Sequence, residues 1–235
     1  MAIKIILCIL FGYAIGSINP SYIIGRVRGF DIRRRGSGNA GASNAIIIMG
    51  KSIGIFSAVF DFAKATAAFF LADLIFSGVP FASELAVTFC ILGHIYPFYM
   101  KFRGGKGLAS LGGLVLAVDW RLFLILLTVE AVAVLAFDYI CVAPITASIL
   151  FPVLYGVLGS GGLDILLFAN GGWWGAAILA ISSVAILSRH VENIKRIHLG
   201  AELHFSYLWK RGKTQEDELA RIGKTAADRD VDSFE

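Results

Sequence analysis

Long apolar stretches with few charges constrain the fold of this 235-residue chain most strongly. Seven such stretches cover about 3–25, 53–76, 84–100, 107–118, 121–138, 140–159 and 173–188. About 20 apolar residues in a helix cross the hydrocarbon core of a bilayer, where backbone polar groups must pair within the protein. The stretches are continuous and do not alternate with polar residues, which argues against a membrane β-barrel. We therefore predict an all-α integral membrane protein with about seven transmembrane helices, the fourth of which is too short to cross comfortably.

Basic residues indicate which side of the membrane each loop occupies. If the N-terminus lies outside, only Lys4 and Arg121 face the outer side. Apart from one lysine within a span, every other lysine and arginine then faces inward. Basic residues concentrate in cytoplasmic loops, so the loops after the first and third stretches and the C-terminus are predicted to be cytoplasmic. Trp120, Trp173 and Trp174 then lie at outer helix ends, where aromatic residues gather.

Three further features bound the domain organisation and the ligand class. The chain divides into a membrane domain, residues 1–204, and a polar cytoplasmic tail, residues 205–235. The first stretch has one N-terminal lysine and no clear cleavage site, which favours a membrane span over a signal peptide. Cys8, Cys90 and Cys141 stand alone in apolar runs, so we expect packing roles for them. The formal net charge of +4 is explained by basic cytoplasmic loops that contact anionic lipid. We therefore predict no nucleic-acid partner, and we also predict no metal or cofactor.

A glycine-rich segment, residues 33–44, lies between the first two stretches. Glycines let backbone N–H groups turn toward an oxyanion, serine and asparagine add donors, and arginines attract phosphate. The segment also fits GxGxxG, but arginines precede it and an apolar span follows it, whereas a dinucleotide fold needs a preceding strand. A solvated connector with basic anchors is the other alternative, although a connector has no need for so many small polar residues. The candidate binding residues are Arg33, Gly36, Ser37, Gly38, Asn39 and Asn44.

A second glycine-rich segment follows the third stretch. It is not a Walker A loop, because Gly107 replaces the serine or threonine after Lys106. Glycines on both sides of a lysine, with a helix beginning just after them, still favour phosphate binding. A positive-inside stop explains the basic residues but not the glycines. The candidates are His94, Gly104, Gly105, Lys106 and Gly107, of which His94 alone could equally be a hydrogen-bonded structural residue.

Two more polar clusters interrupt the apolar pattern. Asp61 and Lys64 lie three residues apart in the second stretch and share a helix face, so we expect a structural or supporting role for this pair. The fourth cluster, residues 188–196, leaves the last stretch on the cytoplasmic side and contains His190 and Asn193. By itself this cluster could be only a basic anchor.

These clusters, in this order, resemble the bacterial acyl-phosphate:glycerol-3-phosphate acyltransferase family (PlsY). The resemblance covers most of residues 15–203. It rests on Ser17-Ile18-Asn19-Pro20, Asp31-Ile32-Arg33, Gly36-Ser37-Gly38-Asn39, Gly41-Ala42-Ser43-Asn44, Asp61 with Lys64, Gly93-His94 with Pro97, Gly104-Gly105-Lys106-Gly107, His190 with Asn193-Ile194, and Gly200-Ala201-Glu202.

The resemblance implies a seven-helix plasma-membrane enzyme that transfers a fatty acyl group from acyl phosphate to the 1-hydroxyl of glycerol 3-phosphate. Lysophosphatidic acid would be the product, without CoA or acyl carrier protein as the direct donor. Ser37, Asn39 and Lys106 are candidates for gripping phosphate or carbonyl oxygens. Asn44 and Asn193 would position polar groups of the substrates. Together with Ser37 and Lys106, the candidate catalytic residues are His94 and Asn193.

His94 has two readings within this chemistry. It could act as a general base on the acceptor hydroxyl, or it could orient that hydroxyl while a donor phosphate oxygen takes the proton. We favour the second reading, because neighbouring phosphates provide a proton acceptor without any side chain.

The chain departs from the family pattern at three places. Ile47 stands where an arginine is usual, Ala65 stands where glycine commonly follows the lysine, and the tail is longer. The missing arginine weakens the assignment of the acceptor phosphate. If the segment after Gly41 is one helix, Lys51 shares a face with position 47 and supplies part of that charge.

Two other functions compete with acyl transfer. A transporter of an organic phosphate would use several helices and an intramembrane ion pair, but its binding groups should lie at mid-membrane on broken helices. Here Ser37, Lys106 and Asn193 are all expected on the cytoplasmic rim. A non-catalytic lipid-binding scaffold has little use for two glycine-rich loops.

Overall fold

The structure is a computed structural model that describes residues 1–160, 167, 172–200, 202 and 204–208. Within these residues the secondary structure is helical, with one isolated β-bridge between Tyr139 and His204, which confirms the predicted all-α class for the described part. Most of the predicted tail, residues 209–235, lies outside the described residues. The α-helices are α1 (Ala2–Ser17), α2 (Pro20–Val27), α3 (Ala42–Met49), α4 (Lys51–Ile75), α5 (Ala82–Ile95), α6 (Leu108–Val118), α7 (Trp120–Phe137), α8 (Val142–Leu158), α9 (Gly172–Ser188) and α10 (Val191–His198). The 3₁₀ turns are η1 (Ile32–Arg34), η2 (Phe98–Met100) and η3 (Phe205–Leu208).

Helix lengths agree with a membrane protein. Among the described residues, α4, α7 and the continuous segment Gly172–His198 are long and apolar enough to cross a bilayer, and α1 with α2 makes a fourth if the bent pair is one span. The helices α6 and α8 are apolar but shorter. Seven helices, α1 and α4 to α9, correspond one to one with the seven predicted apolar stretches. That all seven cross the bilayer stays a prediction.

The first predicted span is broken, which corrects the stretch 3–25. The helix α1 ends at Ser17, and α2 starts at Pro20 with a bend of 49° between them. Proline has no N–H and disfavours helical backbone in the residue before it, so Pro20 ends one helix and starts the next. Asn19 caps α2, because its side chain accepts a hydrogen bond from the Tyr22 N–H.

The third predicted stretch, 84–100, also ends early. The helix α5 stops at Ile95, and Phe98–Met100 forms a separate 3₁₀ turn after Pro97. The same physical reason applies, because Pro97 cannot continue the helix. The helix therefore ends five residues earlier than the hydropathy pattern indicates, and the segment after it leads into the second glycine-rich loop.

Glycines allow α1 to lie directly against α5. A side chain at Gly12 would collide with the Ala86 carbonyl, and one at Gly16 would collide with the Cys90 carbonyl. These glycines are four residues apart on one face of α1, the spacing that lets two membrane helices approach closely. The helix α5 also packs on α4 and α9, and α4 packs on α6, so α5 lies centrally in the bundle.

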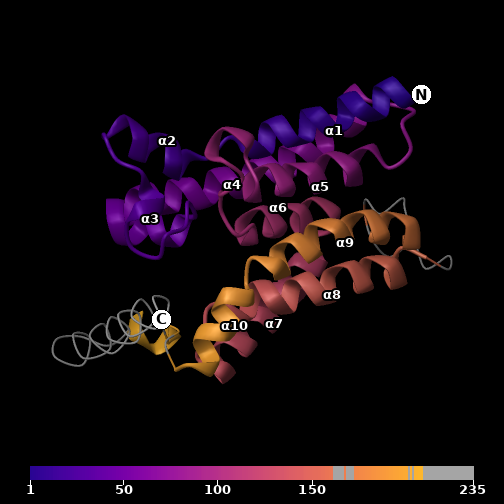
Figure 1. Cartoon of the computed structure of the whole chain (residues 1–235). Helices are drawn as coiled ribbons and strands as arrows, with labels where there is room; N and C mark the ends of the chain where they lie inside the picture. The colour runs from indigo at the N-terminus through magenta and orange to yellow at the C-terminus, as the bar shows by residue number, and fades with distance from the viewer. Residues whose placement is uncertain (161–166, 168–171, 201, 203, 209–235) are drawn as a thin grey trace, which may run out of the picture.

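The arrangement places the motif-bearing segments at one end of the bundle. Figure 1 shows α2, α3 and α10 at the end opposite the N-terminus, whereas the end of α8 and the beginning of α9 lie toward the N-terminal end. This is the arrangement expected when successive long helices run in alternating directions.

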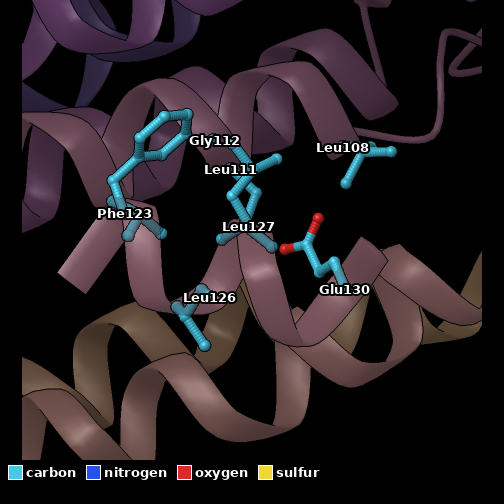
Figure 2. A pocket seen from close by; sticks show the side chains of 8 residues that line it. Leu108, Leu111, Gly112, Phe123, Leu126, Leu127 and Glu130 are labelled. Atoms are coloured by element: carbon cyan, nitrogen blue, oxygen red, sulfur yellow. The ribbon is translucent and has the colours of Figure 1, made fainter. Parts of the chain in front are cut away.

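The helix α7 buries only Leu122, Leu126 and Val134, and it leaves most of its apolar side chains exposed, as lipid contact would require. Between α7 and α6 lies a cavity of about 30 Å³. Figure 2 shows the Glu130 carboxyl group at the edge of this cavity, near Leu108 and Leu127.

Candidate active site

The side chain of Asn44 holds the first glycine-rich loop together. Asn44 is buried at the start of α3 and donates hydrogen bonds to the carbonyl oxygens of Ile32, Arg35 and Asn39, at 3.1, 3.0 and 2.8 Å. Its Oδ1 atom accepts the Ser37 N–H at 2.9 Å. The predicted substrate contact of Asn44 therefore stays untested, and its amide already serves four contacts within the loop.

Positive φ angles shape the loop around Ser37. Gly36 and Gly38 have φ of 58° and 71°, a region that favours glycine. A side chain at Gly36 would also collide with the Asn44 side chain. The turn leaves Ser37 exposed, while Asn39 is half-buried beside it. The local sequence thus presents the Ser37 hydroxyl outward from a braced backbone.

Arg33 fastens this loop to the second one. Its guanidinium forms two hydrogen bonds to Asp31, at 3.0 and 2.7 Å, and donates Nη1 to the carbonyl oxygens of Met100 and Arg103. The hydrogen bond from Arg33 lowers the pKa of Asp31 below its usual range. These contacts use the Nε, Nη1 and Nη2 donors of Arg33 within the protein. Its predicted role in substrate binding stays a prediction.

The second glycine-rich loop folds back on the end of α5. The Gly104 and Gly105 N–H groups donate to the carbonyl oxygens of Ile95 and His94, at 2.9 and 3.0 Å, and so satisfy the last carbonyls of α5. These two N–H groups are therefore used within the protein, and the predicted contact of Gly104 and Gly105 with substrate stays a prediction. A side chain at Gly105 would collide with the His94 imidazole, so the glycine lets the loop cover that ring.

Gly107 sets the start of α6. Its φ is 91°, and a side chain there would press against Ile95 and Ile186. Among the described residues, no side chain caps the N-terminus of α6. The first N–H groups and the dipole of this helix point back toward the segment that carries Lys106.

His94 belongs to a buried polar cluster beneath the loops. Lys64 Nζ lies 2.7 Å from Asp61 Oδ1 and 3.1 Å from His94 Nδ1, and Asp61 Oδ1 lies 3.2 Å from the same ring nitrogen. Lys64 also donates to the Ile18 carbonyl oxygen at 2.8 Å, a carbonyl freed by the break between α1 and α2. All three charged or titratable side chains are at least 95% buried. The pair Asp61 and Lys64 therefore supports His94 and the helix break.

A hydrogen bond to the side-chain amide of Asn193 connects Lys106 to α10. Its Nζ donates to Asn193 Oδ1 at 2.6 Å, and Asn193 Nδ2 donates to Glu202 Oε1 at 2.7 Å. Glu202 also pairs with Arg196 at 2.6 Å. Burial lowers the pKa of Lys106 below its ordinary value, nearby arginine charges lower it further, and Glu202 opposes this shift. Lys106 and Asn193, which the sequence placed in separate clusters, are thus in direct contact.

His190, the other predicted residue of this cluster, is buried between α9 and α10. Its Nδ1 lies 2.8 Å from the Ile186 carbonyl oxygen, which orients the ring within the protein. Its predicted contact with substrate stays a prediction.

Lys51 does not occupy the position inferred from a single helix. Gly50, with φ of 94°, separates α3 from α4, so Lys51 begins a new helix and does not share a face with Ile47. Both side chains are exposed. The geometric argument for Lys51 as a substitute cation is therefore wrong.

The segment 97–107 connects the predicted clusters. It receives Arg33 from the first loop, it covers His94, and it carries Lys106 to Asn193. Three positioning residues were not predicted as site residues: Asn19, whose Nδ2 donates to the Ala40 carbonyl, Asp31 and Glu202. An asparagine directly before a proline is a helix-cap signal, which could have identified Asn19.

Comparison with known proteins agrees with this arrangement. The family model described as glycerol-3-phosphate acyltransferase matches residues 6–200. Glycerol-3-phosphate acyltransferase 1 of Oceanobacillus iheyensis is 38% identical over 196 residues, which covers 80% of this chain and 88% of that protein. Glycerol-3-phosphate acyltransferase of Lactiplantibacillus plantarum is 33% identical over 211 residues, which covers 88% and 96%.

Solved structures give the same result. The crystal structure of PlsY, an integral membrane glycerol 3-phosphate acyltransferase, in its glycerol 3-phosphate form has a TM-score of 0.73 and 30% identity, covering 87% of this chain and 96% of that one. Its lysophosphatidic acid form has a TM-score of 0.69 at 30% identity. The family match and the resemblance to these structures confirm the recognition drawn from the motifs: the chain belongs to the glycerol-3-phosphate acyltransferase family.

Proposed function

We propose that this membrane protein transfers a fatty acyl group from acyl phosphate to the 1-hydroxyl of glycerol 3-phosphate and releases lysophosphatidic acid and phosphate. One observation carries the proposal: segment 97–107 links the braced Ser37 loop to the pair of Lys106 and Asn193. A cationic group and exposed small polar residues at one end of a membrane bundle suit two phosphate-bearing substrates.

The reaction needs positioning more than covalent catalysis. An acyl phosphate is a mixed anhydride, so the acceptor hydroxyl can attack the carbonyl carbon once the two are held together. The new ester C–O bond forms as the bond between the acyl carbon and the phosphate oxygen breaks. The hydroxyl proton goes to a phosphate oxygen. Lys106 stabilises the negative charge that develops on the leaving phosphate, and Ser37 donates a hydrogen bond to a phosphate or carbonyl oxygen.

His94 supports this site from below. It is 97% buried, its Nδ1 faces Lys64 and Asp61, and the backbone at Gly105 covers its other side. This burial favours the reading in which a phosphate oxygen, and not the imidazole, accepts the proton. The assignment of His94 as a base thereby becomes the weaker alternative.

A donor comparison tests the activity. Purified protein receives labelled glycerol 3-phosphate together with palmitoyl phosphate, palmitoyl-CoA or palmitoyl carrier protein, and lysophosphatidic acid is quantified. We expect product from the acyl phosphate alone, and no product when glycerol replaces glycerol 3-phosphate. Product from the thioesters but not from the acyl phosphate would contradict the proposed donor.

We also propose that α1 and α4 to α9 make seven crossings, with the N-terminus outside and the site in the cytoplasm of a bacterial cell. The distribution of basic residues supports this orientation. The three cysteines are buried, so a cysteine introduced at exposed Ser43, in the first turn of α3, or at exposed Ser77, just after α4, reports on one end of the bundle. An impermeant thiol reagent should label Ser77→Cys in intact cells and Ser43→Cys only after permeabilisation. The reverse pattern would place the site outside.

Transport of an organic phosphate is the weaker candidate. Its ion pathway would use the intramembrane pair of Asp61 and Lys64, but these two charges bind each other, and Lys64 also donates to the Ile18 carbonyl. In proteoliposomes, labelled glycerol 3-phosphate should not accumulate inside without acyl donor, and accumulation would favour transport.

A further inference from the structure

A short segment after α10 is fastened to the turn between α7 and α8. Asp138 accepts hydrogen bonds from the Ser206 N–H at 2.6 Å and from the Ser206 hydroxyl at 2.8 Å. The Asp138 carbonyl oxygen accepts the Phe205 N–H at 2.7 Å. His204 lies 3.0 Å from the Asp138 carboxylate, and its ring stacks on Tyr139 with centroids 4.7 Å apart. We name this set of contacts the Asp138 clasp.

A short series of contacts, through Glu202 and Asn193, connects the segment that follows α10 to Lys106. Glu202 lies two residues before His204, and it holds both Asn193 and Arg196. Asn193 in turn accepts the hydrogen bond from Lys106. Each contact in this series is 2.6 or 2.7 Å long. The position of the segment that contains Glu202 therefore bears on the direction in which the Lys106 ammonium points.

The backbone conformation of Asp138 suits it to the turn between α7 and α8. It ends α7 in the left-handed conformation, with φ of 60°, which directs the chain back toward α8. Aspartate and asparagine tolerate this conformation better than most residues. The clasp residues 204–206 lie beyond residue 200, where the family model ends, so the family match does not account for them.

We propose that Asp138 is a positioning residue: by fixing residues 204–206 it holds Glu202 in place, and through Asn193 it aligns Lys106 for catalysis. The proposal rests on the proposed acyl transfer. A hydrogen-bond series of this kind has a preorganising effect, because a displaced donor stabilises the transition state less well.

The main variant is Asp138→Asn, which keeps the side-chain shape and the backbone conformation but removes the charge. The matched control is Asp119→Asn at the other end of α7. Asp119 also accepts backbone N–H groups, those of Arg121 and Leu122, and it also reaches a distant segment through the Leu167 N–H at 3.2 Å. It lies at the opposite end of the bundle from Lys106, so it reports the cost of losing an aspartate contact without disturbing the site.

We expect Asp138→Asn to lower kcat on the order of tenfold, whereas Asp119→Asn lowers the melting temperature with kcat within about twofold. Ser206→Ala removes only one contact of the clasp and should lower kcat to a smaller extent. If Asp138→Asn leaves kcat within twofold of the parent enzyme, the clasp does not position the site.

A double-mutant cycle separates positioning from general destabilisation. If Asp138 acts through Glu202, the variant Asp138→Asn/Glu202→Gln should have nearly the kcat of Glu202→Gln alone. The pair Asp119→Asn/Glu202→Gln should instead show the product of its two single effects. Multiplicative effects in both pairs would contradict the proposed series of contacts.

Hydrogen exchange supplies a readout that does not depend on activity. In the parent enzyme, the amide of Ser206, which donates to the Asp138 carboxylate, should be protected from exchange, and Asp138→Asn should weaken this protection while Asp119→Asn preserves it. Lost protection with unchanged kcat would show that the clasp exists but has no positioning role. A parent enzyme that makes no lysophosphatidic acid would contradict the proposed function itself, a result distinguishable from the failure of Asp138 alone.

Discussion

At the scale of single residues, the site depends on polar side chains that hold its loops as much as on those that can touch substrate. Asn44 and Asp31 use their polar atoms within the protein, and they determine how Ser37 and Arg33 are presented. These hydrogen bonds are maintained because a buried polar atom without a partner costs free energy. Ser37 and Lys106 are consequently the residues with the clearest route to substrate.

Gly105 gives the sharpest steric prediction. Gly105→Ala places a methyl group on the His94 imidazole, so the loop must move away from α5. We expect at least a tenfold loss of kcat, because Lys106 is the next residue and moves with the loop. The control is Gly25→Ala in α2, where the added methyl group meets only ordinary contacts of 3.4 Å or more. Full activity in Gly105→Ala would show that the loop has room the structure does not give it.

The lowered pKa of Lys106 predicts a pH dependence. Lys106 must be protonated to attract phosphate, so the rate should fall as the pH rises through that lowered pKa. Arginine keeps its charge at higher pH, although it lacks the compact shape of lysine. Lys106→Arg should therefore reduce kcat while moving the alkaline limb of the pH profile upward. An alkaline limb at the same pH in both enzymes would mean that another group controls it.

The sequence predicts which residue types gather in the site, but not which way each donor points. The motifs placed Ser37, Lys106 and Asn193 in separate polar clusters, and the structure joins the last two directly. The sequence could not predict that the N–H groups of Gly104 and Gly105 donate to the last carbonyl oxygens of α5. That choice depends on the angle at which the loop returns, and neighbouring helices set this angle.

At the scale of helices, apolar length predicted where elements exist, and prolines and glycines set where they end. Pro20 and Pro97 shorten two predicted spans, and their sequence signal was available. Gly50 divides α3 from α4, and Lys51 and Ser52 follow it, so the sequence carried a signal for this break. The face inferred to be shared by Ile47 and Lys51 assumed one helix across Gly50, and that assumption failed.

Close packing of α1 on α5 predicts a stability effect. Gly16→Ala inserts a methyl group against the Cys90 carbonyl, and overpacking of this kind costs about 1–3 kcal/mol. We expect a lower unfolding temperature in detergent, together with lower activity, because α5 carries His94 at its end. Ala14→Leu, at an exposed position of the same helix, is the control and should unfold like the parent. Equal unfolding temperatures for all three would contradict the close helix contact.

At the scale of the whole molecule, the reversal of direction between successive helices gathers the motif loops at one end of the bundle (Figure 1). Hydropathy and charge predict this gathering, because they give the number and order of the stretches. They do not predict contacts between distant turns, such as Asp138 with Ser206, 68 residues apart. Those contacts need the lateral packing of α7, α8 and α9, which no local pattern encodes.

The central claim is that Ser37 and Lys106 serve one acyl-transfer site. The most direct measurement is the turnover of palmitoyl phosphate and labelled glycerol 3-phosphate by purified Lys106→Met and Ser37→Ala, with Lys4→Met at the other end of the bundle as control. Removal of a preorganised donor commonly lowers the rate about 100- to 1,000-fold, so both site variants should be nearly inactive while the control matches the parent. Two well-folded site variants that keep more than about half of the parent activity would contradict the claim, because the loss of a preorganised donor should lower the rate far more than twofold.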